Sequence, residues 1–201
     1  MTISRTGVFG GTFDPPHLGH LILAAEAQAQ LGLTRLLWVL TAQPPHKPGQ
    51  PVSPLKHRLA MLELAIAGDP YSEISRIEID RPGPHYAADT VRLLRDRHPE
   101  TELVYLMGGD SLRDLPNWQR PSDLLAGCRF IGVMRRPGDS VDLSALERLL
   151  PGIQAKVRFV NAPLLEISSR EIRRRITVGG HFRYYLPESV YKYIVQQKLY
   201  I

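Results

Sequence analysis

The sequence predicts an α/β fold in which a Rossmann-like, doubly wound parallel sheet is covered by helices. Short apolar runs typical of buried strands recur along the chain, and segments with the apolar spacing of helices separate them. The first two runs enclose a helical segment, and such βαβ units are right-handed and parallel in nearly all cases. We expect one domain, residues 1–201, whose part from about residue 165 onward is helical.

The composition is that of a globular protein, with 43% hydrophobic and 22% charged residues. Its single cysteine, Cys128, permits no internal disulfide, fits a reducing cytoplasm and lies in an apolar run that predicts a small buried side chain. The sequence shows no signal peptide and no apolar run of about 18 residues, so we expect a cytoplasmic protein that does not enter the membrane.

The chain is basic, with a formal net charge of +5 and a pI near 9.5. Such a charge suits either a nucleic acid or a small polyphosphate as partner. The basic residues are spread along the chain, most densely from Arg170 to Arg175, without the interleaved aromatic residues of single-strand binders. We therefore expect a small anionic substrate and no nucleic acid.

The first informative stretch runs from Gly10 to His20, with the letters GGTFDPPHLGH, between a strand at Val8-Phe9 and a helix to about residue 31. Its glycines can adopt backbone angles closed to other residues and let a ligand approach the main chain. The first N–H groups of the helix have no partner within it and attract anions. His17 and His20 are three apart and share a helix face, so we expect a phosphate site beside two imidazoles.

A second strand is expected at 36–40, followed by a proline-rich loop over 42–54 that contains His46 and Lys47. Because ligands of open α/β sheets bind beyond the carboxyl ends of the strands, these two residues are candidates to hold a phosphate. The alternative is that they are solvated loop charges. A helix at 55–67 and a half-buried strand at 74–79 come next.

A helix is expected from Tyr86 to about Arg97, and a buried strand at 103–107 then leads into Gly109 and Asp110. An acidic residue just beyond a strand can accept hydrogen bonds from a ribose, or it can cap the helix that follows. Trp118 is either a core residue or a stacking platform. A fifth strand at 130–134 ends in Arg135, which would lie near a bound nucleotide if the strand order is as expected.

The second informative stretch follows a helix at 143–150 and a strand at 157–160. Ser168 and Glu171 have the spacing of a capping box, so a helix begins there. Its free N–H groups, two serines, and Arg170 and Arg173 on one face could hold another phosphate. A capped surface helix with solvated arginines is the alternative. The tail, 186–201, is expected to form an amphipathic helix, and we assign it no chemistry.

These stretches together resemble the nucleotidylyltransferase superfamily, whose His-x-Gly-His element is shared with class I aminoacyl-tRNA synthetases. The match is best to bacterial nicotinate-nucleotide adenylyltransferases and rests on elements in the same order along the whole chain. The resemblance implies catalytic roles for His17, His20 and Arg173. It implies ATP contacts by Gly10, Gly11, Thr12, Phe13, His17, His20, Gly109, Asp110, Ile167, Ser168, Ser169 and Arg173. It implies mononucleotide contacts by His46, Lys47, Tyr86, Ala87, Asp89, Thr90 and Trp118.

Two positions depart from the family pattern. Ala87 stands where threonine is usual, which removes a hydroxyl but leaves the backbone N–H that the family presents to the pyridine carboxylate. Arg170 stands where threonine or serine is usual, so its role stays open.

The implied reaction transfers AMP from ATP to nicotinate mononucleotide, giving deamido-NAD and pyrophosphate, with Mg²⁺ present as MgATP and no metal held by the protein alone. A homo-oligomer is compatible with the sequence. The other acceptors considered are nicotinamide mononucleotide and a phosphopantetheine. Outside this enzyme class, an RNA-binding relative of the synthetases and a non-catalytic nucleotide sensor remain alternatives.

Overall fold

The computed structural model describes residues 4–43, 52–134, 141–163 and 165–201. His46, Lys47 and Arg135, all singled out above, lie outside the described residues.

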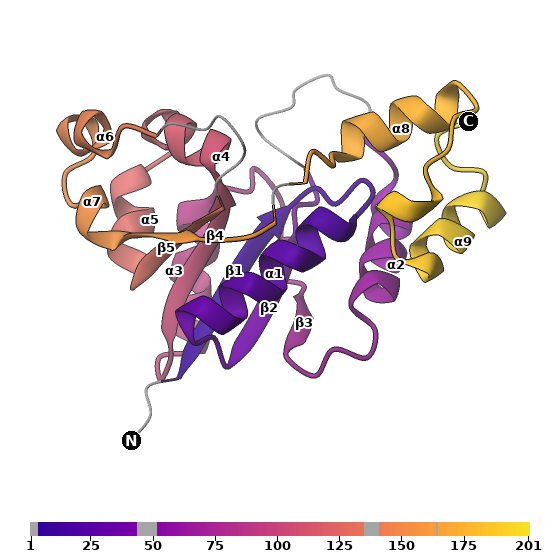
Figure 1. Ribbon diagram of the computed structural model, residues 1–201. Helices are drawn as coiled ribbons and strands as arrows, with labels where there is room; N and C mark the ends of the chain where they lie inside the picture. Colours follow the sequence, from indigo (N-terminus) through magenta and orange to yellow (C-terminus); the bar gives the residue numbers. More distant parts are fainter. Residues whose placement is uncertain (1–3, 44–51, 135–140, 164) are drawn as a thin grey trace.

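The strands of the described residues form one parallel sheet of six strands in the order β3-β2-β1-β4-β5-β6 (Figure 1). They are β1 (Arg5–Gly11), β2 (Arg35–Leu40), β3 (Ser72–Ser75), β4 (Glu102–Gly108), β5 (Phe130–Met134) and β6 (Val157–Val160). The chain builds outward from β1 to β3, returns to the other side of β1 and continues to β6. This order confirms the doubly wound prediction and places the reversal of direction between β1 and β4.

Helices cover both faces of this sheet (Figure 1). They are α1 (Leu18–Leu31), α2 (Leu55–Ile66), α3 (Ala87–Arg97), α4 (Gly109–Asp114), α5 (Pro121–Gly127), α6 (Leu143–Leu149), α7 (Ile153–Lys156), α8 (Ser169–Thr177) and α9 (Glu188–Gln196), with 3₁₀ turns η1 (Leu115–Asn117) and η2 (Arg183–Tyr185). None of the helices in the described ranges is long and apolar enough to cross a bilayer.

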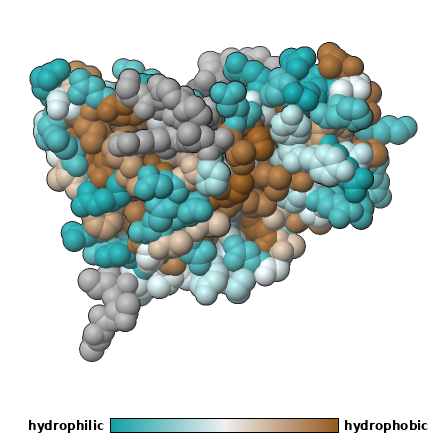
Figure 2. Space-filling view, viewed as in Figure 1, coloured by the Kyte–Doolittle hydropathy of each residue, from teal (hydrophilic) through white to brown (hydrophobic). Residues whose placement is uncertain are grey.

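The alternation of side chains along β1 divides the core between the two faces. Val8 packs with the apolar residues of α3 and α5, whereas Phe9 packs on the opposite face with those of α1. A third cluster joins α2, α8 and α9 through residues that include Met61, Ile172 and Val190. Figure 2 shows hydrophobic residues over α1 in the middle of one face, with hydrophilic surface to either side.

The boundaries of most elements agree with the sequence, and two do not. The strand expected at 74–79 was wrong: β3 ends at Ser75, and the chain then turns, with the Asp80 N–H donating to the Arg76 carbonyl (2.9 Å). The turn packs Ile77 and Ile79 against the core with the polar Glu78 between them, and this spacing produced the apparent alternation. The tail helix is also shorter than expected, because α9 occupies only Glu188–Gln196. The prediction for Cys128 is confirmed: the side chain is buried, and burial raises the pKa of its thiol to about 12.

The expectation that Gly10 and Gly11 provide unusual backbone angles was wrong. Both lie in β1, and the left-handed angle of this turn falls on Phe13, whose φ is 46°. At Gly11 the absence of a side chain is what matters, because a Cβ there would lie 2.8 Å from the Phe13 ring. The glycine makes room for the ring to fold back under the strand.

Candidate active site

A cavity of about 640 Å³ opens beyond the carboxyl ends of β1 and β4, where the strand order reverses. Its wall is formed by the ends of β1 and β4, the first turns of α1 and α4, Trp118 and the start of α8. Ligands of open α/β sheets bind at such a reversal, because the loops on its two sides diverge and leave a crevice.

Two histidines stand side by side at the start of α1. His17 is the N-cap residue of the helix, and its backbone N–H donates to Nδ1 of His20 at 3.1 Å. The rings stack with their centroids 3.6 Å apart and an angle of 27° between their planes. Since Nδ1 of His20 accepts a hydrogen bond, the neutral ring carries its proton on Nε2. Both side chains line the cavity, so His20 can offer an N–H donor to an anion there.

The start of α8 forms the facing wall. The Ser168 side chain accepts a hydrogen bond from the Glu171 N–H (3.2 Å), which confirms Ser168 as the N-cap. Hydrogen bonds from Arg174, with a further contribution from Arg175, lower the pKa of Glu171 to about 2. Those two arginines are therefore engaged with Glu171, while the cavity is lined by Ser168, Ser169, Arg170 and Arg173.

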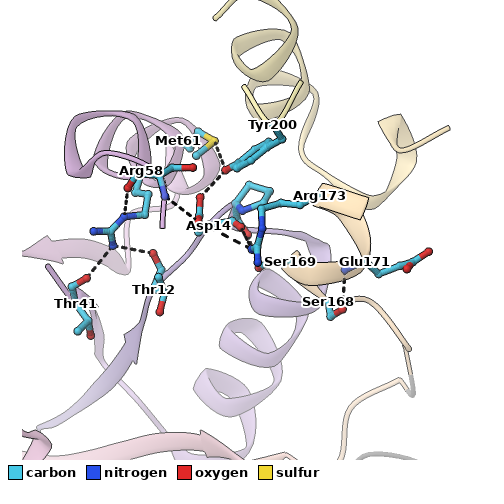
Figure 3. A network of polar contacts seen from close by, with 12 residues as sticks. Thr12, Asp14, Thr41, Arg58, Met61, Ser168, Ser169, Glu171, Arg173 and Tyr200 are labelled. Carbon is cyan, nitrogen blue, oxygen red and sulfur yellow. Dashed lines mark hydrogen bonds and ion pairs between the residues drawn. The ribbon is translucent and has the colours of Figure 1, made fainter. Parts of the chain in front are cut away.

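The two helix starts are joined by direct hydrogen bonds (Figure 3). The Ser169 hydroxyl donates to the Pro15 carbonyl (2.8 Å), and Nη1 of Arg173 donates to the Asp14 carbonyl (2.6 Å). The partners are more than 150 positions apart in the sequence, 154 and 159 respectively. The fold thus brings the N-termini of two helices, each with the partial positive charge of the helix dipole, to one cavity.

The remaining residues implied for ATP fall into two groups. Gly10, Asp110 and Ile167 line the cavity with the residues already named, and the Asp110 carboxylate pairs with Arg113 at 2.6 Å. The others are absent from that wall: Gly11 at the end of β1, Thr12, Phe13, and Gly109, the buried first residue of α4.

The residues implied for the mononucleotide are more scattered. Trp118 lines the cavity, with its indole N–H donating to Asp114 (3.2 Å) and its ring edge-on to Tyr105. Tyr86, Ala87, Asp89 and Thr90 form the start of α3 and do not line the cavity.

The side chains at the start of α3 make contacts within the protein. The Thr90 hydroxyl is buried and donates to Glu78 at 2.6 Å, and Asp89 pairs with Arg120 at 2.6 Å. Burial also lowers the pKa of the neighbouring His85, against the opposing influence of Glu78. A ligand would therefore meet the backbone of this segment more readily than the Thr90 side chain.

Sequence reasoning missed three residues beside the two helix starts: Asp14, Arg58 and Tyr200 (Figure 3). Arg58 carried a usable signal, because it occupies the same face of α2 as the apolar Met61 and Leu62 and is only 2% exposed. Asp14 stood within the first motif, but nothing local indicated its partners. Tyr200 follows α9 and carried no signal.

Comparisons with known proteins agree with this geometry. Residues 8–175 match the family described as Cytidylyltransferase-like. A Thermomicrobium roseum protein named "Probable nicotinate-nucleotide adenylyltransferase" is 46% identical over 198 residues, covering 98% of this chain and 92% of the relative. A Roseiflexus castenholzii protein of the same name is 43% identical over 200 residues, and both chains are covered completely.

Among solved structures, the Plasmodium falciparum nicotinic acid mononucleotide adenylyltransferase complexed with NaAD superposes with a TM-score of 0.81 at 19% identity. That superposition covers 98% of this chain and 97% of the other, and it establishes the likeness of the folds. Full-length identity to the bacterial relatives carries the family assignment. The chain belongs to the nicotinate-nucleotide adenylyltransferase family of cytidylyltransferase-like proteins.

Proposed function

We propose that this protein transfers AMP from MgATP to nicotinate mononucleotide, giving deamido-NAD and pyrophosphate. The observation that carries the proposal is the junction of two helix N-termini, those of α1 and α8, at one cavity that also contains His20 and Arg173. A polyphosphate is the ligand that such paired donor sets suit best. The names of the bacterial relatives point to the same substrates.

The reaction needs alignment and charge neutralisation more than proton transfer. An oxygen of the mononucleotide phosphate attacks the α-phosphorus of ATP, and the bond from that phosphorus to the bridging β-phosphate oxygen breaks, releasing pyrophosphate. The attacking phosphate is already ionised at neutral pH, so a strong general base is unnecessary. Stabilisation of the transferring group and of the leaving pyrophosphate lowers the barrier.

Each helix start has a distinct role in this scheme. Nε2–H of His20 donates to an α-phosphate oxygen, with His17 beside it. The backbone N–H groups of Ser168 and Ser169 and the guanidinium of Arg173 receive the β- and γ-phosphates. Only Nη1 of Arg173 is engaged with Asp14, which leaves its other N–H donors for phosphate oxygens. Mg²⁺ belongs to the substrate, since it keeps waters and binds chiefly to phosphate oxygens.

The mononucleotide then occupies the side of the cavity near Trp118, whose ring offers a stacking surface. The backbone N–H groups of Tyr86 and Ala87 are our candidates to recognise the pyridine carboxylate, and Asp89, His46 and Lys47 remain candidates for the same substrate. Because NAD biosynthesis draws on intracellular ATP, we place the reaction in the cytoplasm.

The decisive measurement is pyrophosphate release from MgATP in the presence of either nicotinate mononucleotide or its amide. We expect the acid to be preferred by at least about 100-fold in kcat/KM, roughly 2.7 kcal/mol of discrimination. Equal rates with the two mononucleotides would show that the protein transfers AMP without preferring the acid over the amide. If neither substrate leads to pyrophosphate release, the proposal is overturned. The next tests would then be pyrophosphate release with phosphopantetheine and filter binding of tRNA at physiological salt.

A further inference from the structure

Tyr200 lies where the two helix starts meet, although it belongs to the segment after α9 (Figure 3). Its phenol donates to Oδ1 of Asp14 at 2.7 Å. Its carbonyl lies 3.2 Å from the hydroxyl oxygen of Thr177, the last residue of α8, and shares that hydroxyl donor with the Arg173 carbonyl at 3.1 Å. One residue thus binds both the loop that leads into α1 and the far end of α8.

Asp14 is the centre of this arrangement. Its side chain is only 5% exposed, and its second oxygen, Oδ2, accepts the Ser53 N–H (3.1 Å) and lies 4.0 Å from Nη1 of Arg173. The Asp14 carbonyl accepts the hydrogen bond from the same nitrogen of Arg173. The Tyr200 hydroxyl and the Ser53 N–H donate to this buried carboxylate. Because they satisfy part of its charge, they reduce how strongly it attracts Arg173.

The backbone conformation of Tyr200 supports the importance of its hydrogen bond to Asp14. Its φ is 68°, in the left-handed region that bulky residues rarely occupy. Such a conformation is strained and persists where surrounding contacts require it. Here the contacts are the hydrogen bonds to Asp14 and Thr177, with the Met61 sulfur 3.9 Å from the phenol oxygen.

The geometry points to Tyr200 as a positioning residue for the polyphosphate side of the site. By satisfying Oδ1 of Asp14 and holding the end of α8, it sets the distance between the two helix starts and keeps Arg173 available to a ligand. The inference rests on the proposed function for the identity of that ligand, MgATP. No contact between Tyr200 and the substrate is involved.

The test is Tyr200→Phe, which removes the phenol oxygen and little else. The matched control is Tyr193→Phe on α9, which removes a phenol oxygen bonded to Nδ1 of His57 at 2.9 Å, away from Asp14. We expect KM for MgATP to rise about tenfold in Tyr200→Phe, because Asp14 without its phenol donor would attract Arg173 more strongly and hold it away from the phosphates. KM for the mononucleotide should stay within about twofold, and Tyr193→Phe should change neither constant.

A merely structural role for Tyr200 would instead lower the melting temperature and kcat without separating the two KM values. An unchanged KM for MgATP, or an equal rise in both variants, would overturn the inference.

Calorimetric titration with MgATP separates failure of this inference from failure of the proposed function. If the unmodified protein binds MgATP without turnover, the ratio of dissociation constants between Tyr200→Phe and the unmodified protein decides the inference alone. If it binds no MgATP, both proposals fail.

Discussion

At the scale of single residues, the site depends on which atom of each side chain is already occupied. The His17 N–H engages Nδ1 of His20 and so directs the other ring nitrogen to a ligand. The carbonyl of Asp14 engages one nitrogen of Arg173, and the other N–H donors of the guanidinium are those that bind phosphate in the function we propose. Internal hydrogen bonds therefore orient the His20 ring and the Arg173 guanidinium before any substrate binds, which reduces the cost of ordering them.

Replacing His20 by alanine should lower kcat at least about tenfold, and losses of comparable donors to a developing charge reach 10²-fold or more. His20→Gln, whose amide can donate from a similar position, should recover part of the loss. Steady-state pyrophosphate release measures both variants, and circular dichroism checks the fold. His98→Ala, at the end of α3 and outside the cavity wall, is the control. Near-normal turnover in His20→Ala would show that this residue does not contribute to catalysis.

At the scale of elements, the turn between β1 and α1 is built around the Phe13 ring. The ring is 2% exposed and packs edge-on against Phe9 and His20, with centroid distances of 5.5 and 5.2 Å. Gly11 lies directly over it. The Phe13 ring therefore packs against the His20 ring and limits its movement. This arrangement requires glycine at position 11.

Gly11→Ala should consequently destabilise the protein by about 1–3 kcal/mol, the usual cost of overpacking. The new Cβ would lie 2.8, 2.9 and 3.1 Å from three atoms of a ring that its neighbours prevent from moving. Urea unfolding measures the change. Gly108→Ala is the control for stability, because a Cβ there meets nothing within 4 Å. Equal stability of the two variants would show that the Phe13 ring can shift.

At the scale of the whole molecule, Arg58 connects segments that are distant in the sequence. Arg58 is only 2% exposed, and burial lowers the pKa of its guanidinium while the charge of Asp14 opposes the change. It donates to the carbonyls of Thr12, Thr41, Ala42 and Ser53 at 2.8–3.1 Å. The segments after β1 and β2 are thereby joined to the start of α2.

Arg58→Met should lower the free energy of unfolding by at least about 3 kcal/mol, because several buried carbonyls lose their donor at once. Arg92→Met, on the exposed face of α3, should change it by less than about 0.5 kcal/mol. Chemical denaturation of both variants makes the comparison. A small effect at Arg58 would mean that water replaces the guanidinium and that the segments hold their positions without it.

The sequence by itself determined the features that depend on near neighbours. Short continuous apolar runs identified five of the six strands, while β3 was misplaced because Ile77 and Ile79 in the turn after it imitate the alternation of a strand. The capping serine of α8 followed from its spacing to Glu171. The paired histidines were placed on one face by helical spacing alone.

The tertiary structure alone decided what depends on how the chain closes. Ser169 and Arg173 meet the Pro15 and Asp14 carbonyls only because the doubly wound sheet returns α8 to the start of α1. Tyr200 reaches Asp14 from 186 positions away. The spacing of apolar residues predicts which face of a helix is buried, but it does not predict which segment of the chain packs against that face. The pairing of distant polar groups is selected by the cost of leaving them buried without partners, and that cost arises only in the folded molecule.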